Sequence, residues 1–321
     1  MNNILIYPIT VGSITLIFRG LLIALSASSF LGIWFGIELN ILGFLILIFT
    51  TEKSKSQRIV EYFVLQAFSR MMLVAGVTLT SRGILRPISQ PIIIISLVIK
   101  AGLPPGHLWF ITLFKQLSRF NVLFLRTIQK LIPFFLLRKM EFDYWVKLIL
   151  VGTVIIRIIV LRVGRFIRVL AYSSVFRGAW CAVVTIKIEL VFLFIRVYFL
   201  NLIVVLKGLN VDHLRQIGLG IQQLVLKVIC LVGILSLSGF PPFSGFFTKI
   251  YLLGHIVVRG KLVEIVVLTI IGPMFFYRYL VFSVNFFKGR QPQRLLTPLI
   301  PLLWVYIRLR VILVLIPVIL I

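Results

Sequence analysis

The chain has 321 residues, of which 60% are hydrophobic and 13% charged, and its mean hydropathy is +1.13. A soluble protein carries about 25% charged residues, and apolar stretches recur here from one end to the other, which excludes an ordinary soluble globular domain. Lysine and arginine number 34 against 8 acidic residues, so the net charge is +26.

The apolar segments predict an all-α, polytopic membrane protein with about ten transmembrane helices. The segments lie at 3–24, 27–50, 59–80, 89–105, 108–137, 146–162, 168–206, 222–258, 263–286 and 296–320. The fifth is long enough to be broken or bent, the seventh is expected to hold two helices, and the eighth is broken at Pro241-Pro242. Polar loops are predicted at 51–58, 138–143, 207–215 and 288–294. No loop is long enough for a soluble domain, so a single transmembrane domain, 1–321, is expected.

The basic residues are scattered singly among Leu, Ile and Val. This distribution is typical of cytoplasm-side loops and of long side chains that reach from helix ends to the lipid headgroups. It favours anionic phospholipid, and not nucleic acid, as a partner.

Arg162, Arg165 and Arg168 recur every third residue, as in a voltage-sensing helix. Such a sensor needs acidic partners on neighbouring helices, which 8 acids in the whole chain hardly supply, so a charged interhelical loop is the favoured interpretation.

Metal, cofactor and catalytic motifs are not evident. Cys181 and Cys230 lie in apolar surroundings and are expected to be packed in the core. His213 and His255 have no partners at metal-ligand spacing, and no glycine-rich phosphate loop follows a strand. We therefore expect no metal site and no cofactor-binding site on this chain.

Two lysines stand in apolar sequence beside double-proline steps. Lys100 precedes Pro104-Pro105, and Lys249 follows Pro241-Pro242. A buried ammonium is costly, and a proline pair opens the backbone hydrogen-bond ladder of a helix. The repetition favours a site, in the manner of transporters whose two halves carry discontinuous helices at corresponding positions. The alternative is that each lysine only caps a broken helix by binding freed carbonyls.

Glu38 and Lys130 also lie well inside apolar segments. A charge at the centre of a membrane helix costs about 2.5–3.5 kcal/mol on insertion scales, so such residues usually face a protein interior or a water-filled cavity. Burial favours the neutral forms of lysine and glutamate, which lets them exchange protons. Glu38 could instead be a structural carboxylate paired with an arginine or asparagine, and Lys130 could reach an interface. His107, beside the first break, is either a proton relay or a satisfied buried histidine.

Six short motifs, in order along the chain, resemble the chain 2 family of mitochondrial NADH:ubiquinone oxidoreductase (respiratory complex I). These antiporter-like membrane subunits are related to cation/proton antiporters. The motifs include Trp34-Phe-Gly-Ile-Glu38-Leu-Asn40 and lie at 34–40, 61–67, 100–110, 127–133, 171–174 and 237–249. The resemblance implies an antiporter-like fold with broken helices. Beyond residue 250 the chain is similar to the family only in hydropathy.

The resemblance also implies a row of proton-transferring residues. Glu38 and Lys100 would form a charge pair at the entry half of a hydrated channel, with Lys130 as the central proton-carrying lysine. Lys249 would be the lysine of the exit half, and His107 would assist between Lys100 and Lys130.

The function implied is proton translocation as a core subunit of NADH:ubiquinone reductase. Other membrane subunits would be partners, and NAD, flavin, iron–sulfur clusters and ubiquinone would be held by partner subunits, with no redox centre on this chain. The expected location is the mitochondrial inner membrane. The chain lacks an Arg/Ser-rich leader, and Glu38 follows a single apolar segment, which is similar to the shortened animal form made inside the organelle. A stand-alone cation/proton antiporter and a purely structural membrane subunit remain the alternatives.

Three positions depart from the family pattern. Arg177 stands where a small polar residue or histidine is usual, Arg70 where a small residue is expected, and Gly106 where an aromatic residue precedes the histidine. Some animal mitochondrial codes read AGA and AGG as serine or glycine. If the sequence was translated with the wrong table, some of its membrane arginines are not arginine in the protein.

Overall fold

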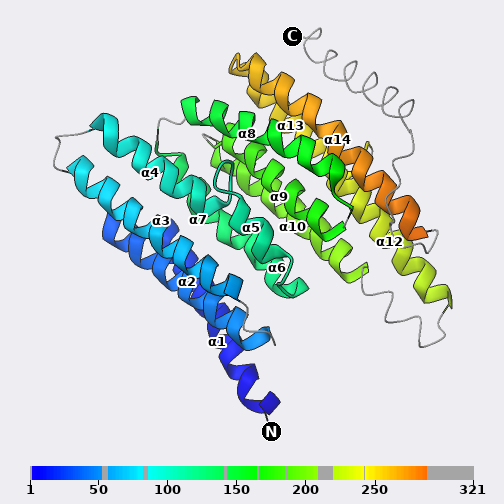
Figure 1. Ribbon diagram of the computed structural model, residues 1–321, viewed down its shortest axis with the longest axis horizontal. Helices are drawn as coiled ribbons and strands as arrows, with labels where there is room; N and C mark the ends of the chain where they lie inside the picture. Colours follow the sequence, from blue (N-terminus) through cyan, green and yellow to red (C-terminus); the bar gives the residue numbers. More distant parts are fainter. Residues whose placement is uncertain are drawn as a thin grey trace. The chain divides into compact units, whose positions relative to one another are not determined.

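The computed structural model describes residues 2–52, 57–81, 86–140, 143–164, 166–185, 187–208, 220–241 and 243–287 (Figure 1). All regular secondary structure in these ranges is helical. The chain divides into two compact units between Trp145 and Val146, and each unit is described by itself. The predicted segment 296–320 and the predicted loop 288–294 lie outside the described residues, as does most of the predicted loop 207–215.

The described part of the first unit contains seven helices. They are α1 (Asn2–Ser26), α2 (Phe30–Thr51), α3 (Gln57–Ser81), α4 (Arg86–Ala101), α5 (Leu108–Phe114), α6 (Arg119–Arg126) and α7 (Ile128–Leu137). In Figure 1, α1 runs along α2 and α3 runs beside α4. The segment 108–137 is broken, as predicted, into α5, α6 and α7. Glu52, at the end of α2, accepts hydrogen bonds from the backbone N–H of Ser118 and the amide of Asn121, which fixes the start of α6.

Helices α1 and α2 approach one another closely because glycines line their contact. A Cβ atom on Gly20 would stand 2.5 Å from the backbone nitrogen of Asn40, and one on Gly36 would stand 2.5 Å from that of Ala24. Small residues permit this backbone approach in membrane proteins. The Asn40 amide then donates to the carbonyl oxygen of Ile17 at 3.1 Å, across the same contact. Glu38 lies between Gly36 and Asn40, so this contact fixes the turn of α2 that carries it.

The second unit contains six described helices. They are α8 (Asp143–Arg162, which begins just before the division), α9 (Phe166–Val183), α10 (Ile188–Gly208), α12 (Gly220–Ser238), α13 (Ser244–Val258) and α14 (Leu262–Phe287). The predicted segment 168–206 is two helices, as expected. Helix α9 is buried on nearly all sides from Val169 to Val183, including its polar Ser173, Ser174 and Arg177. The Tyr279 hydroxyl of α14 donates to Ser173 of α9, and the Phe275 and Phe176 rings stack at 4.9 Å.

Two helices end in the same way where breaks were predicted. Gly102, after α4, has φ +64°, and Gly239, after α12, has φ +81°. The N–H of Gly102 bonds to Ile99 and that of the next residue to Val98, while the N–H groups of Gly239 and its successor repeat the pattern at the end of α12. This is the Schellman motif, which needs a left-handed residue that glycine adopts without strain. A glycine therefore ends each helix before its prolines are reached.

Seven helices among the described residues are long and apolar enough to cross a membrane, and three shorter apolar helices accompany them. This confirms the all-helical membrane fold and agrees roughly with the predicted number. Many large apolar side chains of α8, such as Val151, Ile155 and Ile158, are exposed, as a lipid-facing surface requires. Arg162 is the last residue of α8 and Arg168 belongs to α9. They do not lie along one helix, which favours the interhelical interpretation over a voltage sensor.

Candidate functional site

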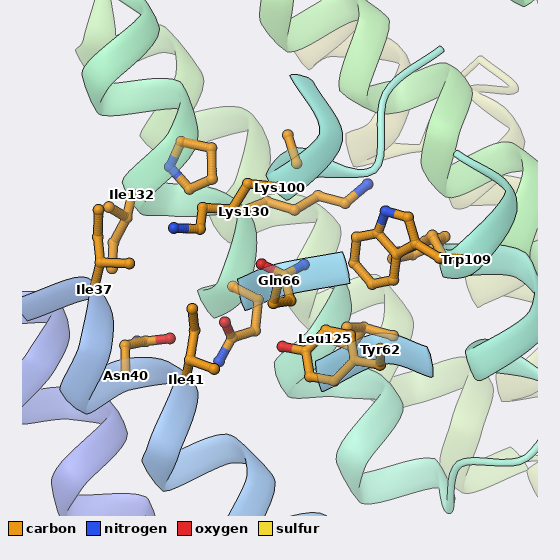
Figure 2. A pocket seen from close by; sticks show the side chains of 14 residues that line it. Ile37, Asn40, Ile41, Tyr62, Gln66, Lys100, Trp109, Leu125, Lys130 and Ile132 are labelled. Carbon is orange, nitrogen blue, oxygen red and sulfur yellow. The ribbon is translucent and has the colours of Figure 1, made fainter. Parts of the chain in front are cut away.

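Lys100 and Lys130 line one small cavity in the first unit (Figure 2). Their side chains are 7% and 5% exposed. The cavity has a volume of about 10 Å³, close to the minimum that holds one water molecule. Figure 2 shows both lysine side chains above Gln66 and Tyr62. Two buried ammonium-bearing side chains beside a water-sized space are what a proton-transfer step needs.

Lys100 comes from the last turn of α4, one residue before the helix ends. Its Nζ atom is buried and has no hydrogen-bond partner. The nearby carbonyl oxygen of Ile99 is occupied, because the indole N–H of Trp109 donates to it at 2.9 Å. Lys100 therefore does not cap its own broken helix, and its ammonium group is held by electrostatics and packing alone.

Lys130 lies in the first turn of α7, just after the break at Thr127. Its Nζ lies over the Phe110 ring, 4.5 Å from the ring centroid. An aromatic face attracts a cation without accepting its proton. The break places this lysine inside the unit, where it does not reach an interface.

Glu38 forms an ion pair with Arg70 of α3, and not with Lys100. The side chains of Arg70 and Glu38 are 12% and 27% exposed. Both charges are close enough to act electrostatically on Lys100. The expected pair between Glu38 and Lys100 is thus replaced by a cluster of three charges. The alternative that Glu38 is paired with an arginine is the one seen here.

Four polar side chains in the cavity were not selected from the sequence. They are the amides of Asn40, Gln66 and Gln129 and the hydroxyl of Tyr62. The Gln129 Nε2 atom is buried without a hydrogen-bond partner. Each of these residues interrupts an apolar run, which is a signal available in the sequence. Amide and hydroxyl groups can both donate and accept hydrogen bonds, so they suit a water chain between the lysines.

His107 does not line this cavity. It is half-buried in the turn after the first break, and its Nδ1 atom lies 3.2 Å from the carbonyl oxygen of Pro105. Its Nε2 atom is buried without a hydrogen-bond partner. The structure therefore brings Lys100 and Lys130 together but leaves His107 at the turn. Gly106 beside it lies tightly against Ile99.

Lys249 lies in the second unit, on α13, and is 7% exposed. Its Nζ atom donates to the carbonyl oxygen of Ser238, the residue before the Schellman glycine of α12, at 2.7 Å. Lys249 thus does what Lys100 does not: it caps the helix that its break opens. A capping function and proton transfer are compatible, because a lysine has three donors.

Metal-binding clusters of three or more His, Cys, Asp or Glu side chains are absent from the described ranges. Cys181 and Cys230 are buried and form no disulfide bond, as expected for core residues. His213 lies outside the described residues.

Comparison with known proteins identifies the family. The family model described as NADH:quinone oxidoreductase/Mrp antiporter, TM, matches residues 27–274. Proteins named NADH-ubiquinone oxidoreductase chain 2 are similar along most of their length. The one from Anopheles gambiae is 26% identical over 295 residues, 86% of each chain. The one from Branchiostoma floridae is 28% identical over 287 residues, 83% of each chain.

Solved structures share the fold. A chain of respiratory complex I from Thermus thermophilus superposes with a TM-score of 0.72 at 20% identity, over 92% of this chain and 74% of that one. A chain of the Mrp complex from Dietzia sp. gives the same TM-score at 16% identity, over 88% of this chain and 60% of that one. These likenesses confirm the antiporter-like helical fold.

Proposed function

Because this chain belongs to the NADH:quinone oxidoreductase/Mrp antiporter transmembrane family, we propose that it is a proton-translocating core membrane subunit of respiratory complex I. NADH oxidation and ubiquinone reduction then take place elsewhere in the complex. The two units together are proposed to form one transmembrane domain. The chain is thus a subunit of an enzyme, the H⁺-translocating NADH:ubiquinone reductase. We propose that it holds no redox centre of its own.

The observation that carries this proposal is the shared cavity of Lys100 and Lys130. Both lysines are buried, both come from ends of interrupted helices, and the Glu38–Arg70 pair acts electrostatically on Lys100. A change of charge around Glu38 alters the proton affinity of Lys100, and through it that of Lys130, since two close titratable groups are coupled. Linked changes in the proton affinities of neighbouring groups can move a proton without forming a covalent intermediate. Lys249 is proposed as the exit lysine and His107 as an assisting group.

The relatives favour complex I over a stand-alone cation/proton antiporter. Those named chain 2 match along 86% or 83% of their own length, whereas the Mrp chain is matched over 60% of its length at 16% identity. Other membrane subunits of the complex are therefore the proposed partners, together with anionic phospholipid around the basic helix ends. NAD, flavin, iron–sulfur clusters and ubiquinone are assigned to partner subunits. The animal relatives support the mitochondrial inner membrane as the location.

The test is Lys130→Ala in the intact complex, compared with Lys139→Ala. Lys139 follows α7 closely and is exposed, so the control removes the same group outside the cavity. Loss of a proton-transferring group costs about 100-fold or more in a step limited by that transfer, so NADH-driven proton pumping and linked ubiquinone turnover should fall at least tenfold while the complex still assembles. Normal pumping by an assembled Lys130→Ala complex would contradict the relay. Sodium-dependent proton flux by the chain outside any NADH-oxidising assembly would favour the antiporter.

A further inference from the structure

A second polar cavity lies within the second unit and is lined by two basic side chains. Arg177 of α9 and Lys249 of α13 are both 7% exposed and both face it. The remaining polar lining is supplied by Tyr198, Asn201, Ser236 and Thr248. None of the described residues that line the cavity is acidic. The cavity has a volume of about 20 Å³, enough for one species of about the size of a water molecule.

The guanidinium group of Arg177 is held in place but is incompletely satisfied. Its Nη2 atom donates to the hydroxyl of Ser173 at 2.8 Å, and its central carbon lies 3.6 Å from the centroid of the Tyr198 ring. The Nε and Nη1 atoms are buried and have no hydrogen-bond partner. Arginine cannot lose its proton in a protein, so this buried positive charge needs an acceptor.

Carboxylates of the described part of the second unit do not supply that acceptor. Glu189 is exposed at the first turn of α10, and Glu264 pairs with Lys261 at the start of α14. Neither lines the cavity. Lys249 donates to the Ser238 carbonyl oxygen, and its positive charge adds to that of Arg177 at the cavity.

We propose that this cavity binds a small monovalent anion of halide size, between the unpartnered Nε and Nη1 atoms of Arg177 and the ammonium group of Lys249. A water molecule would accept the hydrogen bonds but leave the net charge unchanged, whereas an anion satisfies both requirements. The small cavity volume suits a halide better than a phosphate headgroup or an organic carboxylate. The proposal concerns binding and does not depend on the proposed function, although an anion here would change the electrostatic surroundings of the proposed exit lysine.

Bromide is the probe, because its anomalous X-ray scattering identifies it. Crystals of the intact complex prepared in bromide should show an anomalous peak in the cavity within hydrogen-bonding reach of Arg177. The peak should disappear in Arg177→Gln and persist in Arg196→Gln, which removes the same charge from an exposed position on α10. A bromide-soaked wild-type complex without this peak, or a peak that survives in Arg177→Gln, would overturn the proposal.

Wild-type protein alone provides a second measurement, should Arg177→Gln fail to assemble. Chloride added against a fixed bromide concentration should lower the anomalous peak progressively, while gluconate, which is too large for the cavity, should leave it unchanged. Failure of chloride to compete would contradict a halide site. If bromide binds and chloride competes in a complex that does not pump protons, the anion site is supported and only the proposed function is contradicted.

Discussion

The carboxylate of Glu38 is held by the guanidinium of Arg70, while the ammonium of Lys100 remains buried without a hydrogen-bond partner. One negative charge is thus shared by two cations on two other helices, α3 and α4. The arginine holds the carboxylate in a direct ion pair, and the lysine feels both charges at longer range. Any movement of Glu38 from Arg70 toward Lys100 would transfer the counter-charge to the lysine.

This cluster predicts unequal effects of removing its members. In Glu38→Gln, two cations lose their only described counter-charge, whereas in Arg70→Gln the carboxylate can turn to Lys100. Removing one partner of a buried ion pair costs about 3–5 kcal/mol. The amount of assembled complex, measured on native gels, should therefore fall more in Glu38→Gln than in Arg70→Gln. Glu38→Gln combined with Arg70→Gln should recover assembly but not proton pumping. Equal losses in the two single variants would contradict the shared-charge arrangement.

The identity of residue 70 can be measured directly. The ion pair with Glu38 gives an arginine a specific partner here, so we expect the residue mass of arginine in a peptide that spans Phe68 to Met72. A serine or glycine mass would support translation by a variant genetic code. Glu38 would then have no arginine partner at position 70 and could pair with Lys100, as the family resemblance implies. The same measurement at Arg177 checks the residue on which the anion site depends.

Gly239 is predicted to matter through Lys249 as well as through its backbone. A Cβ atom at this position would stand 2.5 Å from the Lys249 Nζ atom, and φ is +81°. Gly260 has φ +69° and open space around it, so Gly260→Ala carries the backbone strain of about 1 kcal/mol without the contact. Proton pumping per assembled complex should fall in Gly239→Ala and stay near the wild-type value in Gly260→Ala. A similar small effect of both substitutions would show that the position of the ammonium group does not matter.

The close contact of α1 with α2 predicts a strong effect at Gly20. Gly20→Val would drive a side chain into the backbone of α2, and overpacking of this kind costs about 1–3 kcal/mol or more. Gly12→Val changes the same helix where nothing lies within 4 Å. Assembled complex should be reduced in Gly20→Val and unaffected in Gly12→Val, as judged by native gels and by the temperature of inactivation. Comparable assembly of the two variants would argue against the packing of α1 on α2 seen here.

The sequence predicted the helices and the burial of the lysines well, because hydropathy and proline steps act locally. It correctly placed Lys100 beside a break and allowed the segment that holds Lys130 to be broken, and the cavity joins the two lysines. It did not predict the partner of Glu38, because Arg70 is 32 residues away and ion pairing depends on how α2 and α3 pack. Nor could it decide between capping and proton transfer for Lys249, since the reach of a side chain to a carbonyl depends on the turn between α12 and α13. The proton-transfer assignments of Glu38, Lys100, His107, Lys130 and Lys249 stay predictions.

The two broken helices place different evolutionary constraints on their lysines. At the first break an indole occupies the carbonyl oxygen of Ile99, so residue 100 is not required to cap the helix, and selection on it acts through its charge and its proposed proton transfer. At the second, Lys249 itself completes the end of α12. A lineage that lost pumping would be free to drift at position 100 while still retaining a long donor side chain at position 249. The retention of Lys249 in a relative is therefore weaker evidence of proton transfer than the retention of Lys100.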